Sequence, residues 1–210
     1  MRIACLAVML VAGAYATAAF SADDAVKPKM TPAQARAYLK AEQIAPLPDN
    51  LAQQILSGNV EAVDAMVVAG VDVNAKTSLP QSSLELAGMT CAGGRVATED
   101  TVHIMNTLIV AGANPNTPGM AGLGPLMLAA QQCKPPVVKR LIGAGAKLDS
   151  RTPQGFTPLS MALIVSNYDA AEALIDGGAR LSAEGGQKLT QGAPDNKRLN
   201  DLVARATKSP

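Results

Sequence analysis

Residues 68–75 read VAGVDVNA, and similar segments recur at 110–116 (VAGANPN), 143–149 (GAGAKLD) and 176–182 (DGGARLS). The aligned glycines, spaced by 42, 33 and 33 residues, are Gly70, Gly112, Gly145 and Gly178. A second marker keeps the same steps, because a short apolar segment opens at each of Leu84, Leu126 and Leu159. Two independent markers in one register indicate an internal repeat, so we expect an array of similar units.

Each unit is predicted to hold two short helices and a loop. Pro125 and Pro158 suit a first helical turn, where the missing N–H costs nothing, and Thr157 is placed to cap the helix that follows it. The second helix ends at the repeated glycine, which favours the left-handed conformation at a helix C-terminus. Such short helices do not persist alone, so neighbouring units must stack.

These segments resemble the ankyrin repeat family, whose unit has about 33 residues and carries Thr-Pro-Leu-His and Gly-Ala-Asp-Val-Asn motifs. Residues 155–159 (GFTPL) resemble the first motif and residues 70–75 (GVDVNA) the second. The chain departs from the family at the His, which is replaced by Glu85, Met127 and Ser160. It also departs at the Gly between the two helices, which survives as Gly58 but becomes Cys91, Cys133 and Ser166.

The resemblance implies an all-α fold, an α-solenoid of about four helix-turn-helix-loop repeats with helical caps. The repeats, together covering 50–182, are expected at 50–76, 77–118, 119–151 and 152–184. Residues 22–49 are expected to form a linker and an N-terminal capping helix. Residues 183–210 are expected to form the C-terminal cap, with a loop over 185–195 and a helix over 196–206.

Composition excludes two classes of protein. With 18 basic and 17 acidic residues among 210, the chain lacks the basic excess of a nucleic-acid-binding protein. Hydrophobic residues make up 48%, which is too many for a disordered chain. Aromatic residues make up only 2%, so the core must be built from Leu, Ile, Val, Met and Ala.

The N-terminus is predicted to be a secretory signal peptide over residues 1–21. Arg2 precedes an apolar stretch at 3–14, and small residues follow up to a cleavage site near Ser21. The alternative is an uncleaved anchor, because the uncharged run over 3–22 has about the length needed to cross a bilayer. We expect cleavage, a periplasmic or secreted mature protein, and no membrane insertion afterwards.

Cys91 and Cys133 occupy the same place in consecutive repeats, and a nine-residue insertion starts after Cys91. Equivalent positions on stacked helices lie about 8–10 Å apart, farther than a disulfide allows, so a bridge needs local adjustment that the insertion can supply. We predict a disulfide, which an oxidising compartment favours. The alternative is two small apolar residues in helix turns. A redox enzyme is disfavoured because no Cys-x-x-Cys motif occurs.

Catalytic and metal-binding constellations are absent from the sequence pattern. His103 is the only histidine and is expected to be solvated on the outer helix of the second unit. It has no Cys or carboxylate partners at ligand spacing, so no metal site is predicted. Gly93-Gly94 precedes no Gly-Lys-Ser/Thr motif, and Glu99 and Asp100 are interpreted as solvated charges at a helix start. We predict that the protein is not an enzyme and uses no cofactor.

The ankyrin resemblance implies that loop tips and the inner face of the first helices bind a protein partner. The partner-binding positions carried over onto this chain are Lys76, Leu79, Gln81, Met89, Met120, Leu123, Gln131, Arg151, Gln154 and Phe156. Met120, Leu123 and Phe156 are predicted to be the central anchors, because exposed apolar clusters mark interaction sites. The alternative is that several of these side chains are buried by the C-terminal cap or by each other.

The function predicted from the sequence is a non-catalytic binding module that acts as a monomer and docks one protein partner. Two more specific versions remain open. One is an immunity-type inhibitor of a toxin delivered to the same compartment, and the other is an accessory protein that stabilises an exported enzyme.

Overall fold

A computed structural model describes residues 30–208, so the predicted signal peptide lies outside the described residues. The described chain is helical, with no strand between residues 30 and 208. Its α-helices are α1 (Pro32–Ala41), α2 (Pro48–Ser57), α3 (Val60–Val68), α4 (Ser83–Met89), α5 (Thr98–Val110), α6 (Pro125–Gln132), α7 (Pro135–Gly143), α8 (Pro158–Ile164), α9 (Tyr168–Asp176), α10 (Ala183–Gln191) and α11 (Lys197–Thr207). Two 3₁₀ turns lie in loops, η2 (Ala92–Gly94) and η3 (Met120–Gly122).

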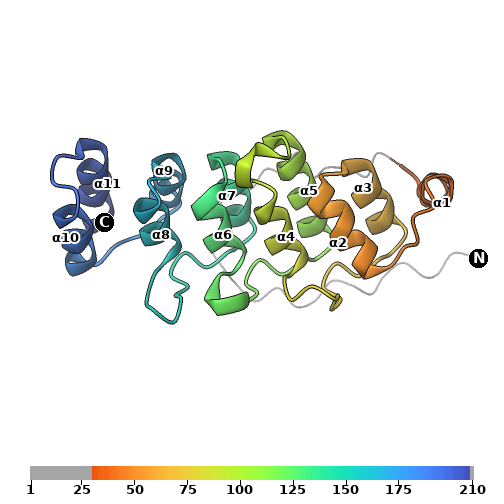
Figure 1. Ribbon diagram of the computed structural model, residues 1–210, viewed down its shortest axis with the longest axis horizontal. Coiled ribbons are helices and arrows are strands. Elements are labelled where there is room, and N and C mark those ends of the chain that lie inside the picture. Colours follow the sequence, from red (N-terminus) through yellow and green to blue (C-terminus); the bar gives the residue numbers. More distant parts are fainter. Residues whose placement is uncertain (1–29, 209–210) are drawn as a thin grey trace, which may run out of the picture.

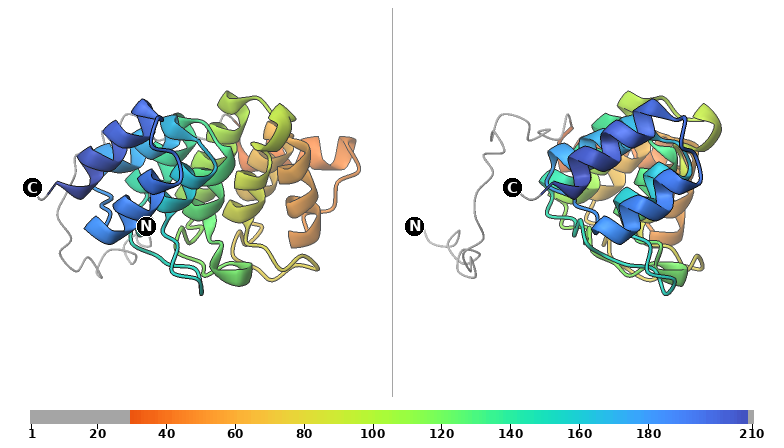
Figure 2. Two further views of the ribbon diagram at one scale, coloured as in Figure 1. Left: turned by 60° about the vertical axis from the view of Figure 1, so that its left-hand side comes forward. Right: turned by 90° about the vertical axis from the view of Figure 1, so that its left-hand side faces the viewer.

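The helices stack in two rows along one axis (Figure 1). The first helices of the units, α2, α4, α6, α8 and α10, pack in one row, and the second helices, α3, α5, α7, α9 and α11, pack in the other. Helix α1 joins the second row beside α3. Viewed along this axis, the loops that connect the units gather on one side, next to the first helices (Figure 2). The predicted all-α solenoid is confirmed.

The ends of the helices follow the sequence signals. Thr157 caps α8 through a capping box with Ser160, and Pro158 opens that helix. Each second helix of units 1 to 4 is followed by the repeated glycine, with φ between 83° and 102°. These positive φ angles are the left-handed conformation that a glycine adopts without strain, and they turn the chain into the loop.

The core is continuous from one unit to the next and is aliphatic. The repeated leucines Leu84, Leu126 and Leu159 are all buried, and each packs into the layer between the two rows. Burying one such side chain contributes about 2 kcal/mol, so each unit depends on the layers beside it. At the N-terminal end, Ala35 and Leu39 of α1 are buried and cover the first unit.

The C-terminal cap differs from its prediction. The expected loop over 185–195 is wrong, because α10 occupies most of it and completes a fifth helical pair with α11. Gly185 and Gly186 lower helix propensity, which hid the helix in the sequence. Gly186 is required by packing, since a Cβ there would lie 2.8 Å from a side-chain methyl of Val203. Ser182 supplies the N-cap that starts the helix.

Salt bridges tie the fifth unit to the fourth through the second-helix row. Arg205 of α11 donates to Glu172 at 2.8 Å and to Asp176 at 2.9 Å, both on α9. The hydrogen bond to Glu172 is the main cause that raises the pKa of the Arg205 guanidinium. Arg198 pairs with Asp169 one helical turn closer to the N-terminus of α9. The first helices α8 and α10, by contrast, touch only sparsely.

Asparagine side chains join successive loops in a ladder. Asn74 donates from Nδ2 to the Gly112 carbonyl at 2.8 Å and accepts the Asn114 N–H at 3.1 Å. Asn116 repeats this arrangement with the Gly145 carbonyl at 3.0 Å and the Lys147 N–H at 2.8 Å. The next position in the register is Asp149, whose carboxylate cannot donate such a bond when ionised.

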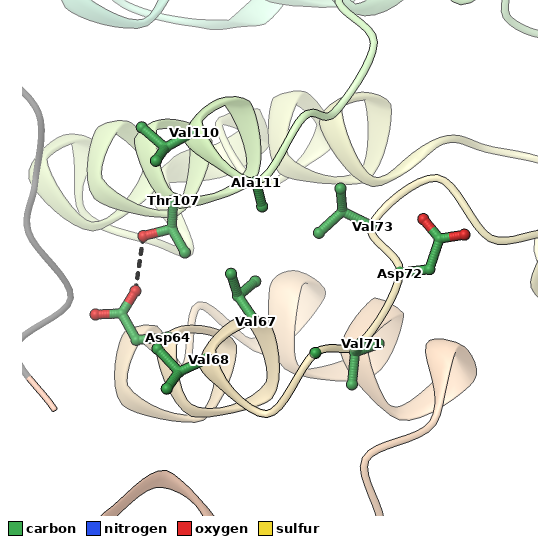
Figure 3. Close-up of a pocket in the computed structure, with 10 residues that line it drawn as sticks. Asp64, Val67, Val68, Val71, Asp72, Val73, Thr107, Val110 and Ala111 are labelled. Atoms are coloured by element: carbon green, nitrogen blue, oxygen red, sulfur yellow. Dashed lines mark hydrogen bonds between the residues drawn. The ribbon is translucent and has the colours of Figure 1, made fainter. Parts of the chain in front are cut away.

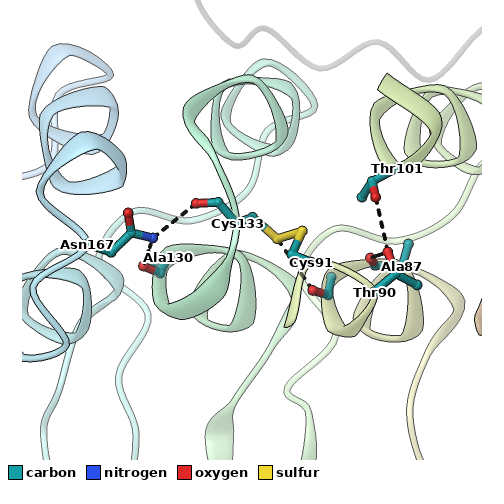
Figure 4. The surroundings of a disulfide bond; sticks show 8 residues. Ala87, Thr90, Cys91, Thr101, Ala130, Cys133 and Asn167 are labelled. Atoms are coloured by element: carbon teal, nitrogen blue, oxygen red, sulfur yellow. Dashed lines mark hydrogen bonds between the residues drawn. A yellow bond between two sulfur atoms is a disulfide. The ribbon is translucent and has the colours of Figure 1, made fainter. Parts of the chain in front are cut away.

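A disulfide joins Cys91 to Cys133, with their Cα atoms 5.0 Å apart (Figure 4). The two cysteines come within reach because the chain leaves the two helices differently: Cys91 keeps helical backbone angles, whereas Cys133 is extended. The insertion after Cys91 forms η2 and then folds back over unit 1, where Val96 lies against Gly58. The disulfide therefore anchors the inserted loop to unit 3 while its other end packs on unit 1.

Candidate functional site

A groove between α8 and α10 brings three of the predicted partner-binding residues together. Arg151, Gln154 and Phe156, from the loop before α8, line one side of a cavity of about 400 Å³. The segment after α9 and residues of α10 up to Leu189 also line it. The sparse contact between α8 and α10 leaves room for this groove, so it belongs to the surface formed by first helices and loop tips. We call this surface the inner face.

Phe156 is held at the groove by a tight turn. The Thr152 N–H donates to the Phe156 carbonyl at 2.9 Å, and the Thr152 hydroxyl accepts the Phe156 N–H at 3.2 Å. Gly155 makes the turn possible with a φ of 87°. Thr152 is buried, whereas 39% of Phe156 is exposed, so the turn presents the ring to solvent from a fixed base.

The other predicted anchors lie outside this groove. Met120 is 63% exposed on η3, a turn that contains the left-handed Ala121 and is preceded by Gly119. Leu123 is half-buried behind it. A second hollow of about 330 Å³ lies between this loop and the next, and Arg151 lines both hollows. The three predicted anchors therefore occupy two adjacent loops, and only Phe156 reaches the α8–α10 groove.

The predicted positions of unit 2 and of α6 are spread along the inner face. Lys76 and Met89 are exposed, whereas Leu79, Gln81 and Gln131 are half-buried. Leu79 packs against the core, so it is partly covered.

Residues of the inner face that were not predicted from the sequence include Leu56 of α2, and Lys188 and Leu189 of α10. Met89 has an equivalent in Leu56 of α2, 33 residues earlier, and another in Ile164 of α8, and all three are exposed. The repeat register would have identified Leu56. Lys188 and Leu189 of the groove were missed because their helix was interpreted as a loop.

The charges of the groove are mainly positive. Arg151, Arg180 and Lys188 line it together with one carboxylate, Glu184. Lys188 donates to Glu184 at 2.6 Å, and this hydrogen bond holds the pKa of the Glu184 carboxyl below its usual value. The Glu184 carboxylate is therefore engaged, and the two arginines have no carboxylate partner among residues 30–208.

The expectation that His103 is a solvated surface residue is wrong. Its Nε2 lies 2.8 Å from Oδ2 of the buried Asp64, and only 18% of the His103 side chain is exposed. Thr107 donates its hydroxyl to the other carboxylate oxygen at 2.7 Å. The second helices α3 and α5 pack side by side, so residues along their shared flank are covered. A carboxylate within an apolar helix was the sequence signal, since a buried Asp64 requires donors.

A further cavity of about 520 Å³ lies beside this pair, between the C-terminal ends of α3 and α5 (Figure 3). It is lined mainly by valines, including Val67, Val71 and Val110, and none of the predicted partner-binding residues reaches it. Both oxygens of Asp64 at its edge are already bonded to Thr107 and His103.

Residues 30–208 carry neither a candidate metal site nor a candidate membrane span. No group of three or more His, Cys, Asp or Glu residues there is arranged to hold a metal ion. Within the same range, no helix has the length and apolar character needed to cross a membrane.

Residues 95–184 match the family model for ankyrin repeats, in three copies. The match spans the second helix of unit 2 and all of units 3 and 4, and the helices on either side continue the same two-row stacking. Residues 95–184 are therefore ankyrin repeats. Repeats of this family are generally protein–protein interaction modules and typically non-catalytic, which supports a binding role. Comparison with curated proteins gives no matching relative.

Proposed function

We propose that this protein is a non-catalytic, monomeric binding module of the periplasm or the extracellular space that docks one protein partner on its inner face. The observation that carries the proposal is the distribution of exposed apolar side chains. Apart from Val110 at the end of α5, the large apolar residues that are exposed between residues 30 and 208 all belong to the first helices, their ends or the loop tips. A solvated surface rarely collects such residues on one side, whereas interaction sites do.

The proposed compartment is supported by two features of the chain. The N-terminal sequence has the pattern of a cleaved secretory signal, and the Cys91–Cys133 disulfide is a bond that persists in oxidising compartments. Fractionation of cells that produce the full chain, followed by N-terminal sequencing, tests this part. Recovery of an uncleaved chain in a reducing compartment, with Cys91 and Cys133 as free thiols, would contradict it.

The binding role is tested by capturing partners from the native envelope fraction with the mature protein and identifying them by mass spectrometry. The affinity of a purified partner is then measured for Met120→Glu combined with Phe156→Glu. Val110→Glu is the matched control, because Val110 is 58% exposed but lies in the second-helix row. We expect at least about a tenfold loss of affinity for the double variant and none for the control, as for central anchors of an interface. Unchanged affinity of a folded double variant would refute the site.

A further inference from the structure

The α8–α10 groove contains two guanidinium groups that are only partly used. Arg151 donates one bond, from Nη1 to the Gly155 carbonyl at 3.1 Å. Arg180 donates from Nη1 to the carbonyls of Ile175 and Ala179, at 3.2 and 2.9 Å. Each guanidinium has five N–H donors, so both retain donors that can engage a carboxylate bidentately. Their bonds to backbone carbonyls also hold the two groups in place, which lowers the entropy cost of binding.

The same groove has an apolar surface next to these cations. Phe156 and Ile164 are 39% and 47% exposed, and Leu181 and Leu189 line the groove beneath them as half-buried side chains. A large apolar side chain placed here would remove both exposed residues from water, while its neighbours in the ligand would lie near the guanidinium groups. The groove therefore presents one apolar position flanked by positive charge.

We propose that this groove binds an extended, acidic segment of a protein partner, with one large apolar side chain on Phe156 and Ile164 and flanking carboxylates on Arg151 and Arg180. The inference rests on the proposed binding role and specifies the chemistry of its partner. Charge complementarity is its main support, because the only carboxylate lining the groove, Glu184, is already engaged by Lys188.

The size of the groove favours an extended segment over a folded surface. A cavity of about 400 Å³ holds one large side chain with its flanking backbone. The neighbouring hollow shares Arg151 and adds Lys147, so positive charge continues along the loop tips toward unit 3. A nucleic acid would require a basic stripe across the protein, whereas the net charge of the whole chain is only +1.

The test uses a library of random dodecapeptides displayed on phage, selected against the immobilised, oxidised mature protein. We expect the selected peptides to share two or more Asp or Glu residues next to one large apolar residue. Synthetic fluorescent copies are then titrated by anisotropy, and their affinity should fall with rising salt, because exposed ion pairs are screened.

Variants locate the binding. We expect Arg151→Glu to weaken binding of the acidic peptides about tenfold or more, and Phe156→Ala to weaken it by a similar factor. Arg151→Lys should have an intermediate effect, because lysine keeps the charge but not the bidentate geometry. Lys139→Glu is the matched control, because it makes the same charge change at an exposed position of α7 in the second-helix row. Circular dichroism and thermal melting establish that each variant is folded.

The outcomes separate this inference from the proposed function. Acidic peptides whose affinity depends on Arg151 and Phe156, but not on Lys139, support it. Selected peptides that lack acidic residues, acidic peptides insensitive to Arg151→Glu, or a selection that yields no binder each overturn it. In any of these cases the proposed function still stands if changing Met120 and Phe156 together abolishes binding of a partner captured from the envelope fraction. A polyanion such as single-stranded DNA that outcompetes the peptides at physiological salt would also overturn it.

Discussion

The asparagine ladder predicts a stabilising substitution at Asp149. Asn74 and Asn116 each bridge to the following loop, and the register places Asp149 opposite the Gly178 carbonyl. The two segments are already close, because a Cβ on Gly178 would lie 3.8 Å from the side chain of Leu148. Asp149→Asn supplies the missing N–H donor and should add the third rung.

The size of the effect follows from the bond gained. An intramolecular hydrogen bond contributes about 0.5–1.5 kcal/mol net, and an exposed position favours the lower half of that range. A carboxylate and an amide oxygen at 149 can both accept a backbone N–H, so the donor bond is what distinguishes asparagine from aspartate there. We expect a gain of about 0.5–1 kcal/mol and a rise of about 1–4 °C in Tm. Asn116→Asp should lose a comparable amount, because it removes an existing donor.

The assay is urea denaturation at pH 7, followed by far-ultraviolet circular dichroism, on the oxidised protein. Asp149→Ala is the matched control, since it removes the negative charge near Lys147 and Arg151 without supplying an amide. The free energy of unfolding should rank Asp149→Asn above Asp149→Ala, with similar m-values. Equal stability of the two variants would show that no third rung forms and would refute the reasoning.

Three further predictions concern covalent linkage, packing and pH. Changing Cys91 and Cys133 together to alanine removes a crosslink that spans a sequence separation of 42. The free energy of unfolding, measured by urea denaturation, should fall by about 4 kcal/mol because the unfolded chain gains conformational entropy. A loss under about 1 kcal/mol would contradict that explanation. Gly186→Ala should lower Tm, because the added methyl group clashes with α11, and this effect should outweigh the better helix propensity of alanine. A higher Tm would show that α10 and α11 can move apart enough to accommodate the methyl group. Two hydrogen bonds from Ser78, of which the backbone one has the larger effect, hold the pKa of the Asp49 carboxyl below 3.8. Their stabilisation is thus complete above about pH 4 and disappears as pH falls through the lowered pKa. Ser78→Ala removes only the hydroxyl bond and keeps the backbone one, so it should partly flatten the acid side of the stability curve and raise the Asp49 pKa measured by NMR without restoring its usual value.

The sequence was sufficient for the features that repeat. Gly70 and its equivalents specify the helix ends, and the repeated leucines specify the buried layer, because both depend on local conformation and apolar burial. The prediction of secondary structure failed where a segment is stabilised by packing against another helix. Helix α10 forms although Gly185 and Gly186 favour a loop, because α11 supplies the surface against which it packs.

In the candidate site, too, the sequence predicted the repeated positions but not the features that depend on packing between helices. Register placed Arg151 and Phe156 on the inner face, since a loop position can be carried from one repeat to the next. It did not reveal the groove, because that depends on how far α10 stands from α8. His103 was misjudged for a similar reason, as its partner Asp64 comes from the preceding unit 39 residues earlier.

The disulfide also has a mechanical consequence. If the two ends of the solenoid are pulled apart, force travels through the bridge between Cys91 and Cys133 and bypasses the chain segment between them, which corresponds to a sequence separation of 42. A fully extended chain spans about 3.5 Å per residue, so this segment could add about 140 Å to the extended length. That length becomes available only after the disulfide is reduced. Units 2 and 3 then behave as a crosslinked block, while the helices on either side are free to unravel from the two ends of the array.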